Sequence, residues 1–225
     1  MHQTKYIRND FAPLKFKNRN ILIQGKEVWT KTQLRDPVYG ERLRKIHGDR
    51  YREWNPKRSK LSAAILLGLR DLPLFESTKV LYLGASTGTT VSHVADLCPE
   101  GRVYAVEKSN ESFLKLLDLA RSTLNVFPIL EDASKPQKYG YFIEAAEFLY
   151  QDIAQRNQVQ IFNEVVGYFD SIEDFFLILK VRAITSRMSE RDILKTETEK
   201  IENLTVRQII NLNPYSIANY LIVLK

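Results

Sequence analysis

Three charged residues that lie far apart in the chain could together activate a hydroxyl group. Asp152 and Lys180 each end an apolar run, and Lys60 precedes the first such run of the second part of the chain. A lysine whose pKa is lowered by burial or by another cation can act as a base, and a carboxylate can orient it. A second lysine can stabilise the negative charge that develops on the oxygen. Each residue alone is also typical of a surface ion pair, so the hypothesis depends on all three meeting.

The run LGASTGTT combines a sharp turn with the start of a helix. Gly84 allows the turn, Gly88 allows a ligand to approach the backbone, and Thr89 and Thr90 place hydroxyls at the helix N-terminus. Dinucleotide-binding loops carry three glycines as GxGxxG, whereas these two glycines are separated by three residues. No lysine follows as in a P-loop. A cofactor without phosphate, such as S-adenosylmethionine, therefore fits better than NAD or a nucleoside triphosphate.

Acidic residues at the ends of the next two apolar runs extend the predicted cofactor site. Glu107 lies about 20 residues beyond the glycine turn, where a carboxylate can accept both hydroxyls of a ribose. Asp132, followed by Ala133, could accept a hydrogen bond from the adenine amino group. Taken alone, the glycine run and Glu107 are equally well interpreted as a tight turn followed by an exposed acid that binds no cofactor. A NAD-dependent oxidoreductase on a similar sheet is a further alternative.

The elements that must position these residues are predicted from apolar runs and helical periodicity. We expect strands at 79–83, 102–106, 126–130, 145–150 and 175–180, helices at 59–69, 89–97, 111–121, 158–169 and 196–203, and a final strand pair at 207–212 and 219–224. Strands that alternate with helices indicate a doubly wound α/β sheet, whose ligands bind at the carboxyl ends of the strands. Beyond the helix expected at 59–69, the candidate residues lie at or just after the carboxyl ends of these predicted strands. The predicted fold class is therefore a Rossmann-like methyltransferase sheet.

The N-terminal part of the chain has a different pattern and a different charge. Alternation at 14–17, 21–23 and 28–32 predicts a small β module, so we divide the chain into a β module at 1–54 and a methyltransferase domain at 55–225. Residues 1–70 hold 17 Lys and Arg against 6 Asp and Glu (+11), and the remainder holds 16 against 21 (−5), which gives the net charge of +6. Clustered positive charge suits an RNA phosphate backbone, although a solvated basic face explains it equally well.

Composition excludes several classes of protein. The chain contains no apolar run of the roughly 20 residues that a membrane-spanning helix needs, and its N-terminus does not resemble a signal peptide. Cys98 is the only cysteine, so an intrachain disulfide and a cysteine metal cluster are both excluded. We expect a cytoplasmic protein with no membrane association and no bound metal.

Several runs of the chain, in order, resemble archaeal fibrillarin. They are YGERL at 39–43, YREWNPKRSKL at 51–61, VLYLGASTGTT at 80–90, SHV at 92–94, DIAQ at 152–155 and NPY at 213–215. The run at 51–61 is highly specific, whereas the glycine loop alone would not be. His93, within these runs, is expected to be structural rather than catalytic.

The resemblance implies S-adenosylmethionine-dependent 2′-O-methylation of ribose in rRNA and tRNA. It also implies that a C/D box guide RNA selects the target by base pairing. A Nop-family scaffold protein and a small RNA-binding protein of the ribosomal L7 type would complete the ribonucleoprotein. Such a division of labour would explain why the chain shows no RNA module that reads sequence.

The resemblance also implies roles for individual residues. Lys180 would be the base, Asp152 its orienting carboxylate and Lys60 an electrostatic support, with the roles of the two lysines open to exchange. The cofactor-binding residues would be Gly84, Ala85, Thr89, Thr90, Glu107, Lys108, Asp132, Ala133, Asp152, Ile153, Ala154 and Gln155.

The chain departs from the family pattern at three places, and these departures keep other functions open. Lys108 replaces a phenylalanine that could stack on adenine, Arg156 replaces a proline, and Asn219 replaces a histidine that could carry a proton. The alternative is a diverged structural subunit that joins the complex but methylates weakly or not at all. An independent methyltransferase that acts on small molecules or protein is a further alternative, against which the basic N-terminal part argues.

Overall fold

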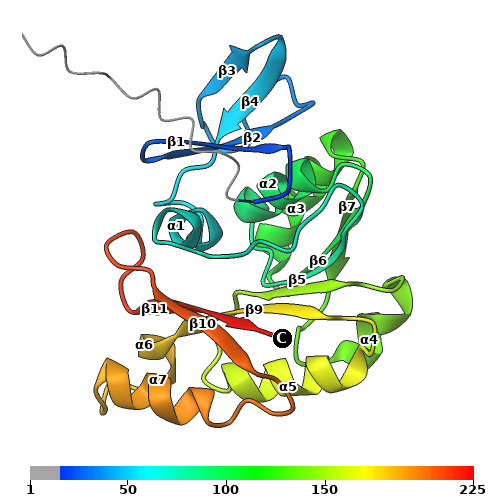
Figure 1. The fold of residues 1–225 in the computed structure, drawn as a ribbon. Helices are drawn as coiled ribbons and strands as arrows, with labels where there is room; N and C mark the ends of the chain where they lie inside the picture. Colours follow the sequence, from blue (N-terminus) through cyan, green and yellow to red (C-terminus); the bar gives the residue numbers. More distant parts are fainter. Residues whose placement is uncertain (1–15) are drawn as a thin grey trace, which may run out of the picture.

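A seven-stranded sheet forms the centre of the computed structural model, which describes residues 16–225 (Figure 1). Its strand order is β10-β11-β9-β8-β5-β6-β7. The strands are β5 (Lys79–Leu83), β6 (Arg102–Glu107), β7 (Val126–Leu130), β8 (Phe148–Gln151), β9 (Asp174–Lys180), β10 (Val206–Asn211) and β11 (Asn219–Leu224). The five strands β5 to β9 pair in parallel, and β11 and β10 extend the sheet in antiparallel fashion. The chain leaves β5 toward one side and later returns through β8 on the other, so the strand order reverses at this point and opens a ligand site.

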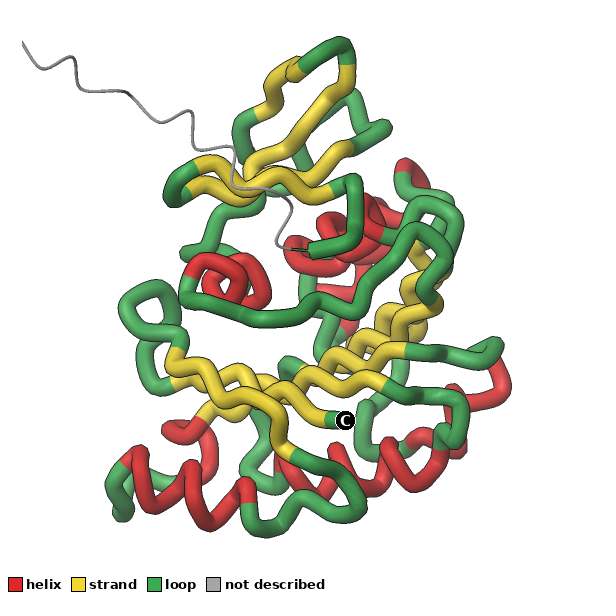
Figure 2. The backbone as a smooth tube through the Cα atoms, viewed as in Figure 1, coloured by secondary structure: helices red, strands yellow, loops and turns green. Residues whose placement is uncertain are grey.

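Helices cover both faces of this sheet (Figure 2). One face carries α1 (Lys60–Leu66), α2 (Thr89–Leu97) and α3 (Asn110–Ser122); the other carries α4 (Pro136–Tyr139), α5 (Gln158–Tyr168), α6 (Val181–Ile184) and α7 (Glu190–Thr198), with a short 3₁₀ helix η1 (Gly140–Phe142). Successive residues of a strand point to opposite faces. Val80 and Tyr82 of β5 therefore enter one core, and Leu81 and Leu83 enter the other.

A second, antiparallel sheet lies above α1 and α2 (Figure 1). Its strands are β1 (Ile21–Gln24), β2 (Glu27–Lys31), β3 (Leu43–Ile46) and β4 (Asp49–Glu53), in the order β1-β2-β4-β3. Val28 of β2 and Trp54, directly after β4, are fully buried in the core that α1 and α2 share. The small sheet is thus packed on the larger part through an apolar contact.

The predicted Rossmann-like fold is confirmed, with local differences. The expected strand at 14–17 falls partly outside the described residues, and Phe16 and Lys17 belong to no strand. The expected helix at 196–203 is wrong in position, because Ser189 caps an earlier start: its hydroxyl accepts a hydrogen bond from the backbone of Asp192. The β3–β4 hairpin was not predicted, because its strands are rich in Arg and Lys rather than in β-branched residues. Within residues 16–225, no helix combines the length and apolar character that crossing a membrane requires.

Candidate active site

The carboxyl ends of the parallel strands surround a cavity of about 260 Å³. It is lined by Gly84, Ser86, Val106, Glu107, Lys108, Glu131, Asp132, Ala133, Asp152, Ile153, Ala154, Gln155 and Lys180. These residues lie at the carboxyl ends of β5, β6, β7, β8 and β9 or directly after them. The structure therefore brings together at one cavity most of the residues that the sequence predicted for a cofactor site.

Two glycines shape the turn that borders this cavity. Gly84 has φ +81°, and a Cβ added there would lie 2.6 Å from the carbonyl oxygen of Asp152. Gly88 has φ +88°, and a Cβ would lie 2.5 Å from the side chain of Leu119 on α3. Both positions combine a left-handed backbone with a close neighbour, so only glycine fits without displacement. Gly84 in particular allows β8 to end directly against the turn.

Glu107 holds the glycine turn on its other side. Its Oε2 accepts a hydrogen bond from the Ser86 backbone at 2.7 Å, and its Oε1 accepts one from the Ser109 backbone at 2.8 Å. Each carboxylate oxygen has two lone pairs, so each keeps one acceptor for a ligand hydroxyl. The carboxylate thus fits the pair of hydroxyls of a ribose.

Asp132 lies at the far side of the cavity as an ionised acceptor. Partial burial acts to raise the pKa of Asp132, but hydrogen bonds from the backbone and hydroxyl of Ser134 and the charge of Lys108 outweigh it and lower that pKa. The carboxylate therefore remains charged at neutral pH and can accept from an amino group. Lys108 at the same cavity is exposed and adds positive charge rather than a stacking surface.

Asp152 bridges the two candidate lysines. Its Oδ2 accepts a hydrogen bond from Lys60 Nζ at 2.9 Å, and its Oδ1 lies 2.8 Å from Lys180 Nζ. Lys180 Nζ also donates a hydrogen bond to the backbone carbonyl of Asp152, 3.1 Å away, so it contacts both the carboxylate and the backbone of that residue. Lys180 lines the cavity, whereas Lys60 approaches Asp152 from α1. We call these three residues the lysine–aspartate triad.

Buried hydroxyl groups lie beneath this triad. Thr90 donates a hydrogen bond to Ser59, the residue that caps α1 just before Lys60. Tyr82 and Tyr150 stack with their ring centroids 4.7 Å apart. Burial chiefly, with the negative charge of Asp152 contributing, raises the pKa of both tyrosines well above the usual value, so both remain neutral. This layer links the glycine-loop helix to the start of α1.

Not every predicted cofactor residue lines the 260 Å³ cavity. Ala85 and Thr90 are buried in the core, and Thr89 instead lines a larger cavity of about 640 Å³. That cavity adjoins the glycine turn through Thr87 and extends to residues 33–39. The turn therefore stands between two hollows. The second hollow was not predicted from the sequence, because its far wall comes from the irregular segment after β2.

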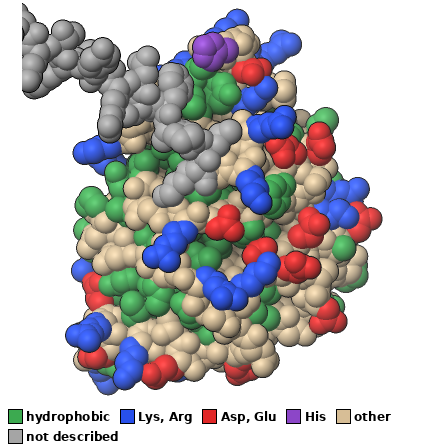
Figure 3. Space-filling model, viewed as in Figure 1, with side chains coloured by type: hydrophobic (Ala, Val, Ile, Leu, Met, Phe, Trp, Pro, Cys, Tyr) green, Lys and Arg blue, Asp and Glu red, His purple; other side chains and the backbone are tan. Residues whose placement is uncertain are grey.

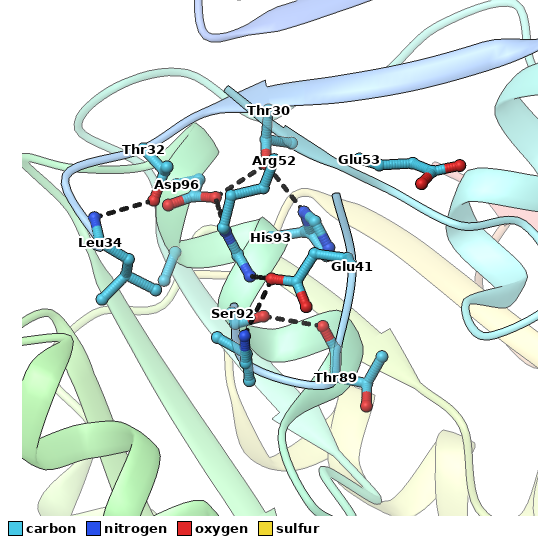
Figure 4. Close-up of polar contacts among 12 residues, drawn as sticks. Thr30, Thr32, Leu34, Glu41, Arg52, Glu53, Thr89, Ser92, His93 and Asp96 are labelled. Atoms are coloured by element: carbon cyan, nitrogen blue, oxygen red, sulfur yellow. Dashed lines mark hydrogen bonds and ion pairs between the residues drawn. The ribbon is translucent and has the colours of Figure 1, made fainter. Parts of the chain in front are cut away.

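A separate charged cluster lies where the small sheet meets α2 (Figure 4). Arg52 of β4 contacts Glu41 Oε1 at 2.6 Å and Asp96 Oδ2 at 2.9 Å. Thr30 also donates to Asp96, and its hydroxyl lies 2.7 Å from His93 Nδ1. We call these five residues the arginine cluster. It fastens strands β2 and β4 to α2.

His93 is a structural member of this cluster, as the sequence predicted. It is fully buried, stacks on Trp54 with ring centroids 5.0 Å apart, and has Nε2 2.8 Å from the Tyr39 hydroxyl. Burial first, and then the charge of Arg52, lowers the pKa of His93 well below its usual value. The imidazole is therefore neutral at pH 7. Its ring lies against the small sheet and not at the cavity of the triad.

The charged side chains outside the cavity form neither a single basic patch on the face shown nor, among the described residues, a metal site. On the face shown in Figure 3, basic and acidic side chains are interspersed rather than gathered into one patch. Part of the N-terminal positive charge is paired, since Arg42 contacts both Glu27 and Glu53. Across residues 16–225, no group of three or more His, Cys, Asp or Glu side chains is arranged to hold a metal ion.

The doubly wound sheet and the cavity at its strand ends define a Rossmann-like methyltransferase. Within that class, the fibrillarin family model matches residues 16–225. The chain belongs to the fibrillarin family.

Individual relatives are similar over nearly the whole chain. The fibrillarin-like rRNA/tRNA 2′-O-methyltransferase of Thermoplasma volcanium is 49% identical over 94% of this chain and 95% of its own length. The structure of Aeropyrum pernix fibrillarin in complex with natively bound S-adenosyl-L-methionine superposes with a TM-score of 0.81, 34% identity, and coverage of 91% of this chain and 93% of that one. A fibrillarin/Nop5p complex gives a TM-score of 0.83 with 38% identity, and coverage of 92% and 97%.

Proposed function

We propose that this chain transfers the methyl group of S-adenosylmethionine to ribose 2′-hydroxyls of rRNA and tRNA, at targets selected by a C/D box guide RNA. The observation that carries the proposal is the bridge from Lys60 through Asp152 to Lys180 at the wall of the cavity. The Thermoplasma volcanium relative bears the name of this activity. The turn lacks the third glycine that NAD-dependent oxidoreductases carry. A competition experiment between S-adenosylmethionine and NAD would distinguish the proposed activity from that alternative.

The cavity fits the proposed cofactor by its donors and acceptors. Glu107 offers two acceptors to the ribose hydroxyls, and Asp132 offers a charged acceptor to the adenine amino group. Because Gly84 has no side chain, its backbone can lie close to that of Asp152; a Cβ there would collide with the Asp152 carbonyl. The bound cofactor would supply an electrophilic methyl group on a sulfonium sulfur. The cofactor in the Aeropyrum pernix structure supports this assignment.

Each member of the triad has a role that follows from its position. Lys180 Nζ takes the 2′-hydroxyl proton as the 2′-oxygen bonds the methyl carbon and the carbon–sulfur bond breaks with its electron pair on sulfur. Asp152 orients Lys180, and Lys60 pairs with that carboxylate and adds positive potential for the developing alkoxide. We assign Lys180 rather than Lys60 as the base because Lys180 lines the cavity.

The proposed complex extends to other components. A Nop-family scaffold is supported by the fibrillarin/Nop5p complex among similar structures. The guide RNA and an L7-type RNA-binding protein rest on the family resemblance. We also propose a cytoplasmic location, where a single buried cysteine remains reduced. The division into a module at 1–54 and a methyltransferase domain at 55–225 remains our proposal.

The test is methyl transfer from labelled S-adenosylmethionine to a guide-paired RNA, with scaffold and RNA-binding partner reconstituted. Label at a single ribose, absent when that nucleotide is 2′-deoxy, would support the proposal. Label on the deoxy substrate would contradict it, because the acceptor would then be another atom. Transfer to small molecules or protein without guide RNA would favour the independent methyltransferase.

A structural subunit is a second candidate, which Asn219 favours. Asn219 lies opposite Lys180 in the sheet, and its amide donates to the Ser216 hydroxyl and the Ile217 carbonyl. A side-chain amide neither takes up nor releases a proton at neutral pH, so Asn219 cannot act as an acid or base in place of a histidine. Cofactor binding and assembly without methyl transfer would support this candidate, and recovery of transfer in Asn219→His would identify the missing group.

A further inference from the structure

The backbone of Lys180 lies where two neighbouring strands separate. β8 ends at Gln151 opposite Leu177, whereas β9 continues for three more residues to Lys180. Beyond Gln151 the chain turns across the end of β5, where the Asp152 backbone donates to the carbonyl of Leu83. The cavity opens at this separation. Lys180 therefore needs a hydrogen-bond partner other than β8 on that side of its backbone.

The side chain of Gln158 provides that partner. Its Oε1 accepts a hydrogen bond from the Lys180 backbone N–H at 2.9 Å, and its Nε2 donates to the Lys180 carbonyl at 3.2 Å. The amide thus contacts the donor and the acceptor of one residue, as a neighbouring strand would. Gln158 is fully buried at the first position of α5.

Gln158 is itself held in place. The carbonyl of Gln158 accepts a hydrogen bond from Gln151 Nε2 at 2.8 Å, and Gln151 is fully buried at the end of β8. The two glutamines therefore form a continuous chain of hydrogen bonds from β8 through α5 to β9. Gln158 is therefore fixed through its backbone carbonyl and through its side-chain amide, which leaves it little freedom to move.

We propose that Gln158 is a positioning residue for methyl transfer, which fixes the backbone of Lys180 so that its amino group stays at Asp152 and the cavity. This inference rests on the proposed function of Lys180 as the base. Asp152 holds the amino end of the lysine, and Gln158 holds its backbone. Both ends must be fixed, because the four-carbon side chain between them is flexible.

The consequence is a specific kinetic effect. Displacing a reacting group by about 1 Å can lower a rate by about a hundredfold, even when the change lies away from the chemistry. Gln158 does not line the cavity. Its loss should therefore lower kcat and leave cofactor affinity and the KM for RNA unchanged. A residue that only stabilised the fold would not divide the two parameters in this way.

The experiment compares Gln158→Met with Val159→Ala in the reconstituted complex. Methionine has a similar length but offers no amide, and Val159 is a buried neighbour on the same helix without contact to the Lys180 backbone amide. We expect kcat to fall about ten- to a hundredfold in Gln158→Met only. Gln158→Glu keeps the acceptor but not the amide donor, so its kcat should lie between Gln158→Met and the wild type. It also provides a measurement if Gln158→Met does not fold.

A second readout does not depend on activity. The NMR signal of the Lys180 amino group, assigned with Lys180→Met, should shift or broaden in Gln158→Met and remain unchanged in Val159→Ala. Equal losses of kcat in the two variants, a loss confined to cofactor binding, or an unchanged lysine signal would each overturn the inference. If the wild-type chain transfers no methyl group, the proposed function fails, and the lysine signal still decides whether Gln158 fixes Lys180.

Discussion

The arginine cluster and the lysine–aspartate triad are built from similar groups in opposite surroundings. In the first, the side chains of Arg52, Glu41 and Asp96 are 0%, 0% and 6% exposed. In the second, those of Asp152, Lys180 and Lys60 are 13%, 21% and 24% exposed. The arginine cluster is enclosed by β2, β4 and α2, whereas Asp152 and Lys180 line an open cavity.

This difference separates two uses of buried charge. A fully enclosed ion cluster has a high desolvation cost, so removing one partner leaves an uncompensated charge and destabilises the fold. A charged cluster at the wall of a cavity, as here with Asp152 and Lys180, can exchange protons with a bound ligand. Ion pairing alone does not mark a catalytic site. The adjoining cavity distinguishes the triad from the arginine cluster.

The largest expected effect is the loss of stability in Arg52→Met. The substitution leaves Glu41 and Asp96 buried without their cation, so the free energy of unfolding should fall by about 3–5 kcal/mol. Urea unfolding measures this change. Cofactor affinity at a temperature where the variant is folded should be retained. A loss below about 1 kcal/mol would mean that the cluster contributes no more than a surface ion pair.

The next largest effect is expected for Glu107→Ala, which should weaken cofactor binding. Loss of the carboxylate removes both acceptors for the ribose hydroxyls, which corresponds to about 1–3 kcal/mol in binding free energy. Calorimetric titration with S-adenosylmethionine checks this value. Glu111→Ala removes an exposed carboxylate nearby and serves as the matched control. Equal affinities in the two variants would remove Glu107 from the cofactor site.

The free energy of unfolding should depend on pH through His93, the titratable imidazole of the arginine cluster. The pKa of His93 is lowered in the folded protein, so below about pH 6.5 the unfolded chain binds a proton that the folded chain does not. Stability should therefore fall with decreasing pH in this window, by up to ~1.4 kcal/mol per pH unit from this residue. His93→Phe should show a shallower slope between pH 6.5 and 5 in urea unfolding. An unchanged slope would show that His93 is protonated in the folded state as well.

The smallest expected effect is a gain of cofactor affinity in Lys108→Phe. A phenylalanine at the cavity wall could stack on adenine and contribute about 0.5–1.5 kcal/mol. Titration of this variant beside Lys108→Ala separates the added ring from the lost charge. If both variants bind the cofactor equally well, the ring adds nothing at this position.

The sequence predicted the parts of the molecule that depend on local patterns. The glycine turn, the strand ends and the residues Glu107, Asp132 and Asp152 follow from apolar runs and from the rule that parallel strands end at one edge. The fold class is confirmed. The start of α7 was wrong, because the apolar pattern is weak there and the cap at Ser189 decides where the helix begins.

The contacts that the sequence did not predict join residues far apart in the chain. Arg52 meets Asp96, 44 positions away, and Gln158 meets Lys180, 22 positions away. No periodicity encodes such pairs, because they depend on how elements pack. A buried glutamine at the start of an apolar helix could have served as a signal, since buried amides need partners.

The most direct measurement is methyl transfer by Asp152→Asn, with cofactor binding and unfolding measured on the same variant. The amide keeps the shape of the carboxylate but cannot bridge two lysines by charge. If the triad is catalytic, kcat should fall about a hundred- to a thousandfold while the fold stays intact. Transfer at the wild-type rate would contradict it, and the triad would then be a structural ion cluster like that of Arg52.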